Sequence, residues 1–141
     1  MPDKLEALYQ ALAQRALEAR EAAYCPYSHF AVGAALLCDD GSVYAGCNIE
    51  NAGLTATNCA ERTAFFRAVA DGRRKFLAIA IAGGPEGEPP AAVCAPCGVC
   101  RQVMAEFCGP DFEIILRDQG GLKRVTLADL LPMAFGPGDL Q

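Results

Sequence analysis

The sequence predicts a three-layer α/β/α sandwich with a mixed central sheet, formed as a single domain by residues 1–141. Segments with helical spacing of apolar residues alternate with short apolar runs that are typical of buried strands. A tight-turn sequence joins the first two runs, which indicates an antiparallel hairpin, whereas a helical segment precedes each later run, as parallel strands require. With 52% hydrophobic residues, the chain can bury one core but is too short to divide comfortably into two domains.

The amino-terminal part predicts a helix followed by a hairpin. Residues 3–23 place leucine and alanine at helical spacing, and Asp3 is suited to the N-cap position. Residues 30–37 form an apolar strand that ends at the turn sequence of residues 39–41. Residues 42–49 then supply the second strand of the hairpin.

The middle of the chain predicts a loop, a helix, a strand and a second loop. Residues 51–57 have the composition of a loop, and residues 59–70 contain good helix formers before a stop signal of aspartate and glycine. Residues 76–82 are a β-rich apolar run. Residues 83–90 are rich in glycine and proline, so we expect them to leave the sheet as a loop.

The carboxyl-terminal part predicts one more helix and at least one more strand. A helical pattern covers residues 97–107, and residues 112–116 form a short apolar strand. Residues 125–131 fit either a last strand or a short helix that ends before Pro132.

Charge and hydropathy exclude several classes of function. The formal net charge is -5, so the chain lacks the basic field that attracts nucleic-acid phosphates. No stretch approaches the roughly 20 consecutive apolar residues of a membrane span, and the amino terminus does not resemble a signal peptide. We therefore expect a cytoplasmic protein that acts on small molecules and binds neither nucleic acid nor a membrane.

The spacing of the cysteines indicates a metal site. Eight cysteines in a cytoplasmic chain are expected to stay reduced, which favours metal ligation over disulfides. Cys97 and Cys100 are close enough in sequence to reach one tetrahedral ion, although such a pair is also compatible with a structural half-site or a redox pair. Cys59 supplies a third ligand. Three protein ligands with an open fourth position define a catalytic zinc site.

Cys94 leaves an alternative open, because Cys94 and Cys97 also form a Cys-x-x-Cys pair. We favour Cys97 and Cys100 as ligands, since Pro96 precedes them and a helical pattern follows. The cysteines outside the ligand set have the character of small buried apolar residues.

Charged residues beside the cysteines indicate the chemistry. Glu61 stands two residues after Cys59, near enough to reach a water on the metal without ligating the metal itself. Three thiolates against one zinc ion leave a net negative charge, which we expect Arg62 and Arg101 to offset by donating to sulfur. Cysteine ligands, a glutamate that is not a ligand and a Pro-Cys-x-x-Cys element match the pattern known for zinc deaminases of nucleobases.

Several further segments make the sequence resemble the small, homotetrameric cytidine deaminases over nearly the whole chain. These segments are residues 26–35 (PYSHFAVGAA), 46–51 (GCNIEN), 59–64 (CAERTA), 96–102 (PCGVCRQ) and 130–135 (LLPMAF). Several motifs in one order are far more specific than a single zinc signature. The resemblance implies the cytidine deaminase fold, one zinc ion per subunit and a homotetramer whose sites are shared between subunits.

The resemblance also implies a set of substrate contacts. It places the ring of Phe30 in the wall of the pocket, and Asn48 and Glu50 on the 3'-hydroxyl of the ribose. It places the backbone of Ala60 on the pyrimidine and the ring of Phe135 in the site of a neighbouring subunit. Together these contacts predict a nucleoside as the substrate.

The sequence therefore predicts the zinc-dependent hydrolytic deamination of cytidine and 2'-deoxycytidine, with Glu61 carrying protons to ring N3 and to the leaving amine. Two alternatives stay open. One is a related deaminase of another aminated nucleoside such as blasticidin S, and the other is a non-catalytic, zinc-stabilised binding module. The family usually has a tyrosine where this chain has Leu54, so affinity or sugar tolerance is expected to differ from that of the usual member.

Overall fold

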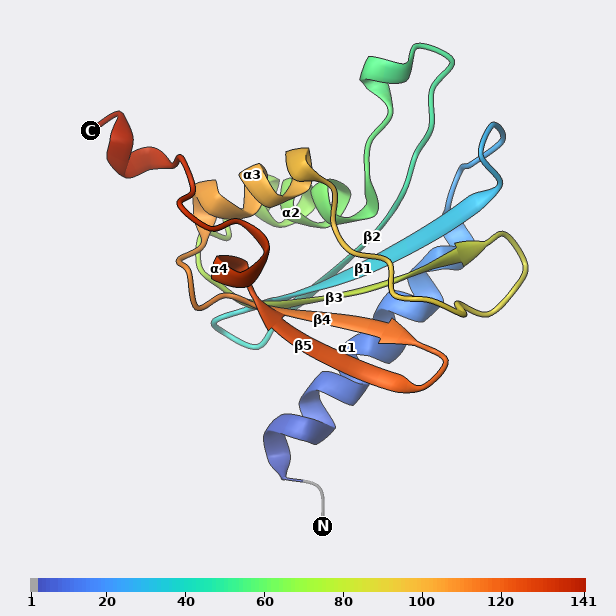
Figure 1. The fold of residues 1–141 in the computed structure, drawn as a ribbon, viewed down its shortest axis with the longest axis horizontal. Helices are drawn as coiled ribbons and strands as arrows, with labels where there is room; N and C mark the ends of the chain where they lie inside the picture. The colour runs from blue at the N-terminus through green and yellow to red at the C-terminus, as the bar shows by residue number, and fades with distance from the viewer. Residues whose placement is uncertain (1–2) are drawn as a thin grey trace.

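A five-stranded mixed sheet forms the middle of the molecule. The computed structural model describes residues 3–141, which Figure 1 shows as a ribbon. The strands are β1 (Phe30–Cys38), β2 (Val43–Cys47), β3 (Phe76–Pro85), β4 (Glu113–Asp118) and β5 (Gly121–Thr126). Their order in the sheet is β2-β1-β3-β4-β5. Only β3 and β4 pair in parallel, and the other neighbouring strands of the described chain are antiparallel, so the sheet is mixed as predicted.

Helices cover both faces of this sheet (Figure 1). On one face, α1 (Lys4–Ala19) packs against small residues of β1 and β3. On the other face lie α2 (Ala60–Ala70), α3 (Gly98–Phe107) and the short α4 (Leu127–Leu130). The larger core is on that second face, where the fully buried ring of Phe65 contacts three other phenylalanine rings. The predicted three-layer sandwich is confirmed.

The first helix begins where the sequence predicts and ends earlier. Asp3 Oδ1 accepts a hydrogen bond from the backbone N–H of Glu6 at 2.7 Å, which confirms Asp3 as the N-cap. A 3₁₀ turn, Arg20–Ala22, follows α1. In that turn the buried Arg20 guanidinium donates to three backbone carbonyl oxygens at the adjoining ends of β1 and β3. No helix within residues 3–141 has both the length and the hydropathy to span a membrane.

Two segments differ from the sequence prediction. The sequence predicts a loop for residues 83–85, but these residues continue β3, because they pair with the first three residues of β1. Pairing satisfies their backbone groups and outweighs the low strand propensity of glycine and proline. Residues 125–131 are both a strand end and a helix, since β5 finishes at Thr126 and α4 follows. The start of β5 escapes prediction because an exposed edge strand carries charged residues in place of an apolar run.

Close packing of α2 on β2 predicts the effect of one substitution. A Cβ atom at Gly46 would lie 2.5 Å from the carbonyl oxygen of Ala60 and 2.5 Å from the backbone nitrogen of Ala64. Neither atom can retreat without moving α2, so Gly46→Ala should destabilise the fold by about 1 to 3 kcal/mol and lower the melting temperature by several degrees. Gly109→Ala is the matched control, because nothing lies within 4 Å of its added atom. Equal melting temperatures in calorimetry would contradict this packing.

Candidate active site

Two helix starts bring three cysteines together. Cys59 is the N-cap of α2, Cys97 is the N-cap of α3, and Cys100 lies in the first turn of α3. The Sγ atoms of Cys59 and Cys97 are 3.7 Å apart, and those of Cys97 and Cys100 are 3.5 Å apart. All three sulfur atoms lie within 4.8 Å of one another, and they form the single cluster of this kind in the described part of the chain.

The three sulfur atoms fit a tetrahedral zinc ion. Zinc–sulfur bonds of about 2.3 Å at tetrahedral angles place neighbouring sulfur atoms about 3.8 Å apart, close to the observed distances. A structural site would need a fourth cysteine or histidine, whereas these three ligands leave one position open. Cys94 lies outside the cluster, because its Sγ atom adjoins Gly83 of β3 next to the ring of Phe30. The cluster therefore has the donor set of a catalytic zinc centre.

The surroundings of the cysteines stabilise negative charge. The pKa of the Cys59 thiol is lowered to about 5, first by the hydrogen bond with Cys100 and then, against the effect of burial, by Arg62 and Cys97. The pKa of Cys100 is raised, because the same hydrogen bond and burial favour its protonated form. These hydrogen bonds favour negative charge on Cys59, which lies at the positive amino-terminal end of α2. Zinc binding would favour deprotonation of the remaining thiols.

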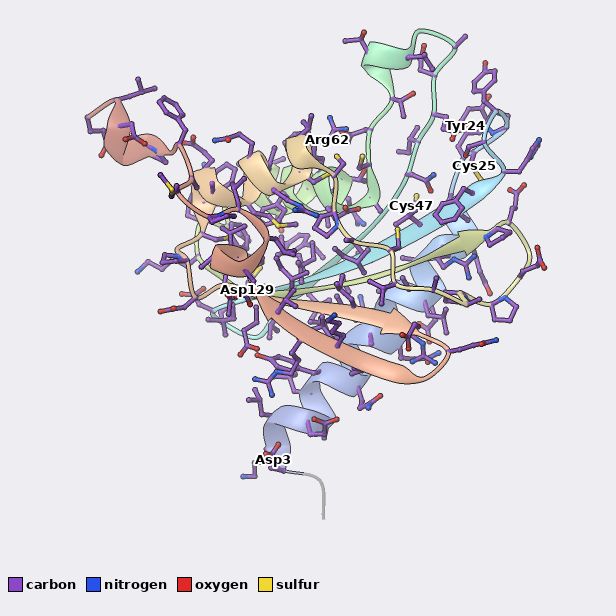
Figure 2. The ribbon with its side chains drawn as sticks, viewed as in Figure 1. Asp3, Tyr24, Cys25, Cys47, Arg62 and Asp129 are labelled. Carbon is purple, nitrogen blue, oxygen red and sulfur yellow. The ribbon has the colours of Figure 1, made fainter. Side chains whose placement is uncertain are left out.

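The two arginines next to the cysteines have different partners. Arg62 Nη2 donates to the Sγ atom of Cys59 at 3.3 Å, and Figure 2 labels Arg62 on the face that carries α2 and α3. Arg101 instead donates to the carbonyl oxygens of Pro96 and Leu130, each at 2.8 Å. Its guanidinium is thus engaged with the backbone before α3 and at the end of α4, and does not donate to sulfur as the sequence suggested. A spacing of one residue from a ligand does not determine where a long side chain points.

Glu61 is a buried carboxyl group beside the thiols. It lies in the first turn of α2, and only 4% of its surface is exposed. Its pKa is raised to about 7, chiefly by burial and to a lesser extent by the charge on Cys59. A first-turn carboxylate that served only the helix dipole would not need to be buried. A buried carboxyl next to an open metal position is placed to accept and release a proton.

Asn48 joins the end of β2 to the start of β1. Its Nδ2 atom donates to the carbonyl oxygen of Phe30 at 2.8 Å, and its Oδ1 atom accepts from the backbone N–H of Val32 at 2.9 Å. Asn48 is buried, whereas Phe30 is 39% exposed. Ala60, the first residue of α2, is completely buried. The structure therefore brings Asn48 and Phe30 together and places Ala60 between the ligand Cys59 and Glu61.

Glu50 is held by a single turn. Its Oε1 atom accepts from the backbone N–H groups of Tyr27 at 2.9 Å and Ser28 at 3.1 Å, and its Oε2 atom accepts from Ser28 Oγ at 2.5 Å. The Ser28 hydroxyl is the first cause that holds the pKa of Glu50 below its usual range. A cavity of ≈ 360 Å³ adjoins this carboxylate and is lined by Tyr27, Ser28, Glu50, Asn51, Leu54 and Thr57. The sequence predicts no role for Ser28, because a serine in a turn 22 residues before Glu50 forms no recognisable motif with it.

Phe135 and Leu54 extend away from the core of their own chain. Phe135 is 58% exposed and Leu54 is 82% exposed. Phe135 follows α4 in the carboxyl-terminal segment, drawn in red in Figure 1, and its carbonyl oxygen accepts from Gln102 of α3 at 2.8 Å. Leu54 lies in the segment between β2 and α2 that projects from the body of the molecule. Neither side chain fills the hydrophobic core.

Known proteins are similar to this chain in sequence and in fold. Residues 7–115 match the family described as "Cytidine and deoxycytidylate deaminase zinc-binding region". A cytidine deaminase of Sporosarcina psychrophila is 53% identical over 124 residues, which cover 87% of this chain and 88% of the relative. The crystal structure of a cytidine deaminase from Burkholderia pseudomallei is similar with a TM-score of 0.81 at 50% identity, over 89% of this chain and 98% of that one.

A blasticidin-S deaminase of Bacillus cereus is more distant, at 30% identity over 107 residues, which cover 74% of this chain and 76% of the relative. The family match includes Cys59, Cys97 and Cys100, and the geometry of these cysteines fits zinc. At 53% identity to a cytidine deaminase over most of both chains, the similarity shows a common family and not merely a common fold. The chain therefore belongs to the zinc-dependent cytidine and deoxycytidylate deaminase family.

Proposed function

We propose that this protein deaminates cytidine and 2'-deoxycytidine at C4 and releases ammonia. The observation that carries this function is Glu61, a carboxyl group with 4% exposure beside three cysteines that leave one coordination position open. Zinc, when bound, lowers the pKa of a coordinated water and so supplies a nucleophile near neutral pH. The remaining steps belong to the side chains of this chain.

Glu61 moves the protons of the reaction. As the oxygen of water bonds to C4, the carboxylate takes a proton from water and delivers it to ring N3. The second proton of the water goes to the C4 amine. The carbon–nitrogen bond then breaks, ammonia departs, and the oxygen on C4 becomes a carbonyl group. Because Glu61 is buried, bulk water does not compete for these protons.

Asn48 and Glu50 have complementary groups for a sugar hydroxyl. Asn48 uses one amide hydrogen for the carbonyl of Phe30 and has a second N–H to donate. Glu50 offers a carboxylate oxygen to accept the hydroxyl hydrogen. A substrate without that hydroxyl leaves the second N–H of Asn48 and the remaining lone pair of Glu50 without a partner, which favours nucleosides over free bases. Phe30 and the backbone of Ala60 are assigned to the pocket wall and the pyrimidine ring.

We assign Phe135 to the site of a neighbouring subunit in a homotetramer. Its exposure supports this, as does that of Met133 and Leu140 in the same segment, because exposed apolar side chains gathered in one segment are typical of an interface. The eight cysteines are free thiols, which supports a reducing compartment and hence the cytoplasm. The net charge of -5 supports a nucleoside rather than a nucleic acid as partner.

Phe135→Ala should raise the Michaelis constant for cytidine by tenfold or more while the oligomer still elutes intact from a sizing column. Removal of a large aromatic ring from a packed contact costs about 3 to 5 kcal/mol, part of which appears as weaker substrate binding. Leu77→Ala is the matched control, since Leu77 is similarly exposed at 51% on β3. A Phe135→Ala protein with an unchanged Michaelis constant would contradict the shared site, and so would wild-type protein that is active as a monomer.

Ammonia release from cytidine, cytosine and blasticidin S, measured beside zinc content, tests the proposed function. We expect rapid turnover of cytidine and turnover of cytosine and blasticidin S that is lower by about 100-fold or more, because unpaired polar groups penalise the poorer substrates. Faster turnover of blasticidin S would indicate the related deaminase. Protein that holds zinc but releases no ammonia from any pyrimidine would indicate a binding module.

A further inference from the structure

We propose that Ser28 is a positioning residue that orients the Glu50 carboxylate toward the 3'-hydroxyl of the substrate sugar. This role rests on the proposed function, in which Glu50 binds that hydroxyl. Ser28 acts through Glu50 and does not itself touch the substrate. It also ties Glu50 to the backbone of Phe30, so that one hydroxyl connects two groups assigned to the pocket.

The direction of the Ser28 hydroxyl is determined by its two neighbours. Ser28 Oγ accepts a hydrogen bond from the backbone N–H of Phe30 at 3.0 Å. A hydroxyl has one hydrogen and two acceptor lone pairs, so its hydrogen remains free to donate. It donates to Oε2 of Glu50 at 2.5 Å. A hydrogen bond to an ionised carboxylate is shorter and stronger than one between neutral groups, so the carboxylate has one preferred orientation.

The two carboxylate oxygens of Glu50 differ in how many further hydrogen bonds they can accept. Oε1 accepts from two backbone N–H groups, those of Tyr27 and Ser28. Oε2 accepts only from the Ser28 hydroxyl among residues 3–141, which leaves a lone pair for a further donor. No lysine, arginine or histidine of the described chain forms an ion pair with Glu50. Ser28 is therefore the side chain that determines where the free lone pair of Oε2 points.

The turn that carries Ser28 is built to hold one conformation. His29 has a φ of 56°, a left-handed value that is uncommon for residues other than glycine. The N–H of His29 donates to the carbonyl of Cys25 at 2.9 Å, and the N–H of Glu86 donates to the carbonyl of His29 at 2.7 Å. A backbone in a sparsely populated conformation persists only where its surroundings hold it there. Ser28 is thus presented to Glu50 from a rigid frame.

The contacts of Ser28 go beyond those of an ordinary turn serine. A serine that stabilises only its own turn bonds to nearby backbone groups, as the bond with Phe30 does. The second bond reaches a carboxylate 22 residues further along the chain, beyond the β1–β2 hairpin. Ser28 and Glu50 both line the cavity of ≈ 360 Å³ described above. Because this bond links distant segments, it indicates that the Ser28 hydroxyl orients Glu50 for its contact with the sugar.

The test compares 2'-deoxycytidine with 2',3'-dideoxycytidine, which differ only in the 3'-hydroxyl. The rate constant kcat and the Michaelis constant KM are measured for wild type, Ser28→Ala and Ser28→Thr, with zinc content and melting temperature as checks. Ser28→Ala should raise KM for 2'-deoxycytidine about tenfold and change kcat/KM for the dideoxy substrate by less than about twofold, because the lost hydrogen bond acts only through the 3'-hydroxyl. Ser28→Thr keeps the hydroxyl and should behave as wild type.

An equal loss with both substrates would show that Ser28 serves the fold alone and would overturn this role. If Ser28→Ala does not fold, Ser28→Cys gives the same comparison, since it preserves size but donates weakly. Wild-type protein that prefers neither substrate overturns the sugar contact of Glu50, and with it the role of Ser28. Wild-type protein that deaminates no cytidine nucleoside overturns the proposed function as well, so the two failures are distinguishable.

Discussion

Glu61→Gln is expected to keep its zinc and its fold but to lose at least about 100-fold in kcat, because general acid–base catalysis contributes about 10²- to 10⁴-fold. The amide preserves the shape of the side chain in its buried position but cannot accept and return a proton. The measurement is ammonia release per bound zinc, with circular dichroism to verify the fold.

Glu106→Gln is the matched control for this substitution, because Glu106 is an exposed carboxylate on α3. Its loss removes the same charge without touching the three cysteines. We expect the control to keep wild-type turnover. Near-wild-type turnover in Glu61→Gln would remove Glu61 from the mechanism.

Cys100→Ser should lose zinc and with it about 100-fold or more of the activity, since the metal supplies the nucleophile. Cys100 is completely buried, and a serine hydroxyl there does not ionise near neutral pH as a thiol does when it binds zinc. Elemental analysis of the purified variant measures the zinc content per chain. Cys97→Ser is expected to behave in the same way.

The variant Cys94→Ser tests whether Cys94 belongs to the set of zinc ligands. Its sulfur atom adjoins Gly83 and Phe30, outside the cluster of three thiols, so the variant should retain zinc. Loss of zinc in Cys94→Ser, together with retention in Cys100→Ser, would show that the wrong pair of cysteines had been assigned to the metal.

Local patterns made much of the fold and the metal centre predictable. The hairpin of β1 and β2 follows from two apolar runs around a tight turn, and the sheet register confirms that pairing. The metal cluster follows from residues that start helices, because Cys59 and Cys97 are N-caps and Cys100 is one turn further on. In each case residues close in sequence determine the local geometry, and the approach of Cys59 to the distant Cys97 and Cys100 follows from the chemistry of zinc ligation.

The features that escaped prediction depend on contacts between distant segments. The extension of β3 over residues 83–85 exists because β1 supplies the partner strand. Arg101 turns toward the backbone of Leu130, whose position is known only once α4 is folded. Ser28 gains its second hydrogen bond from Glu50, which the hairpin brings beside it. None of these contacts has a periodic or compositional signal, so the folded chain is needed to find them.

The most direct measurement is a zinc titration of the protein after a chelator has removed its metal, with ammonia release from cytidine as the readout. If Cys59, Cys97 and Cys100 hold the zinc ion and Glu61 transfers the protons, activity should rise in proportion to bound zinc and saturate at one ion per chain. The Glu61→Gln variant should bind the same zinc without gaining activity. Full activity in the stripped protein, or a full complement of zinc without ammonia release from cytidine, would contradict a zinc-dependent cytidine deaminase.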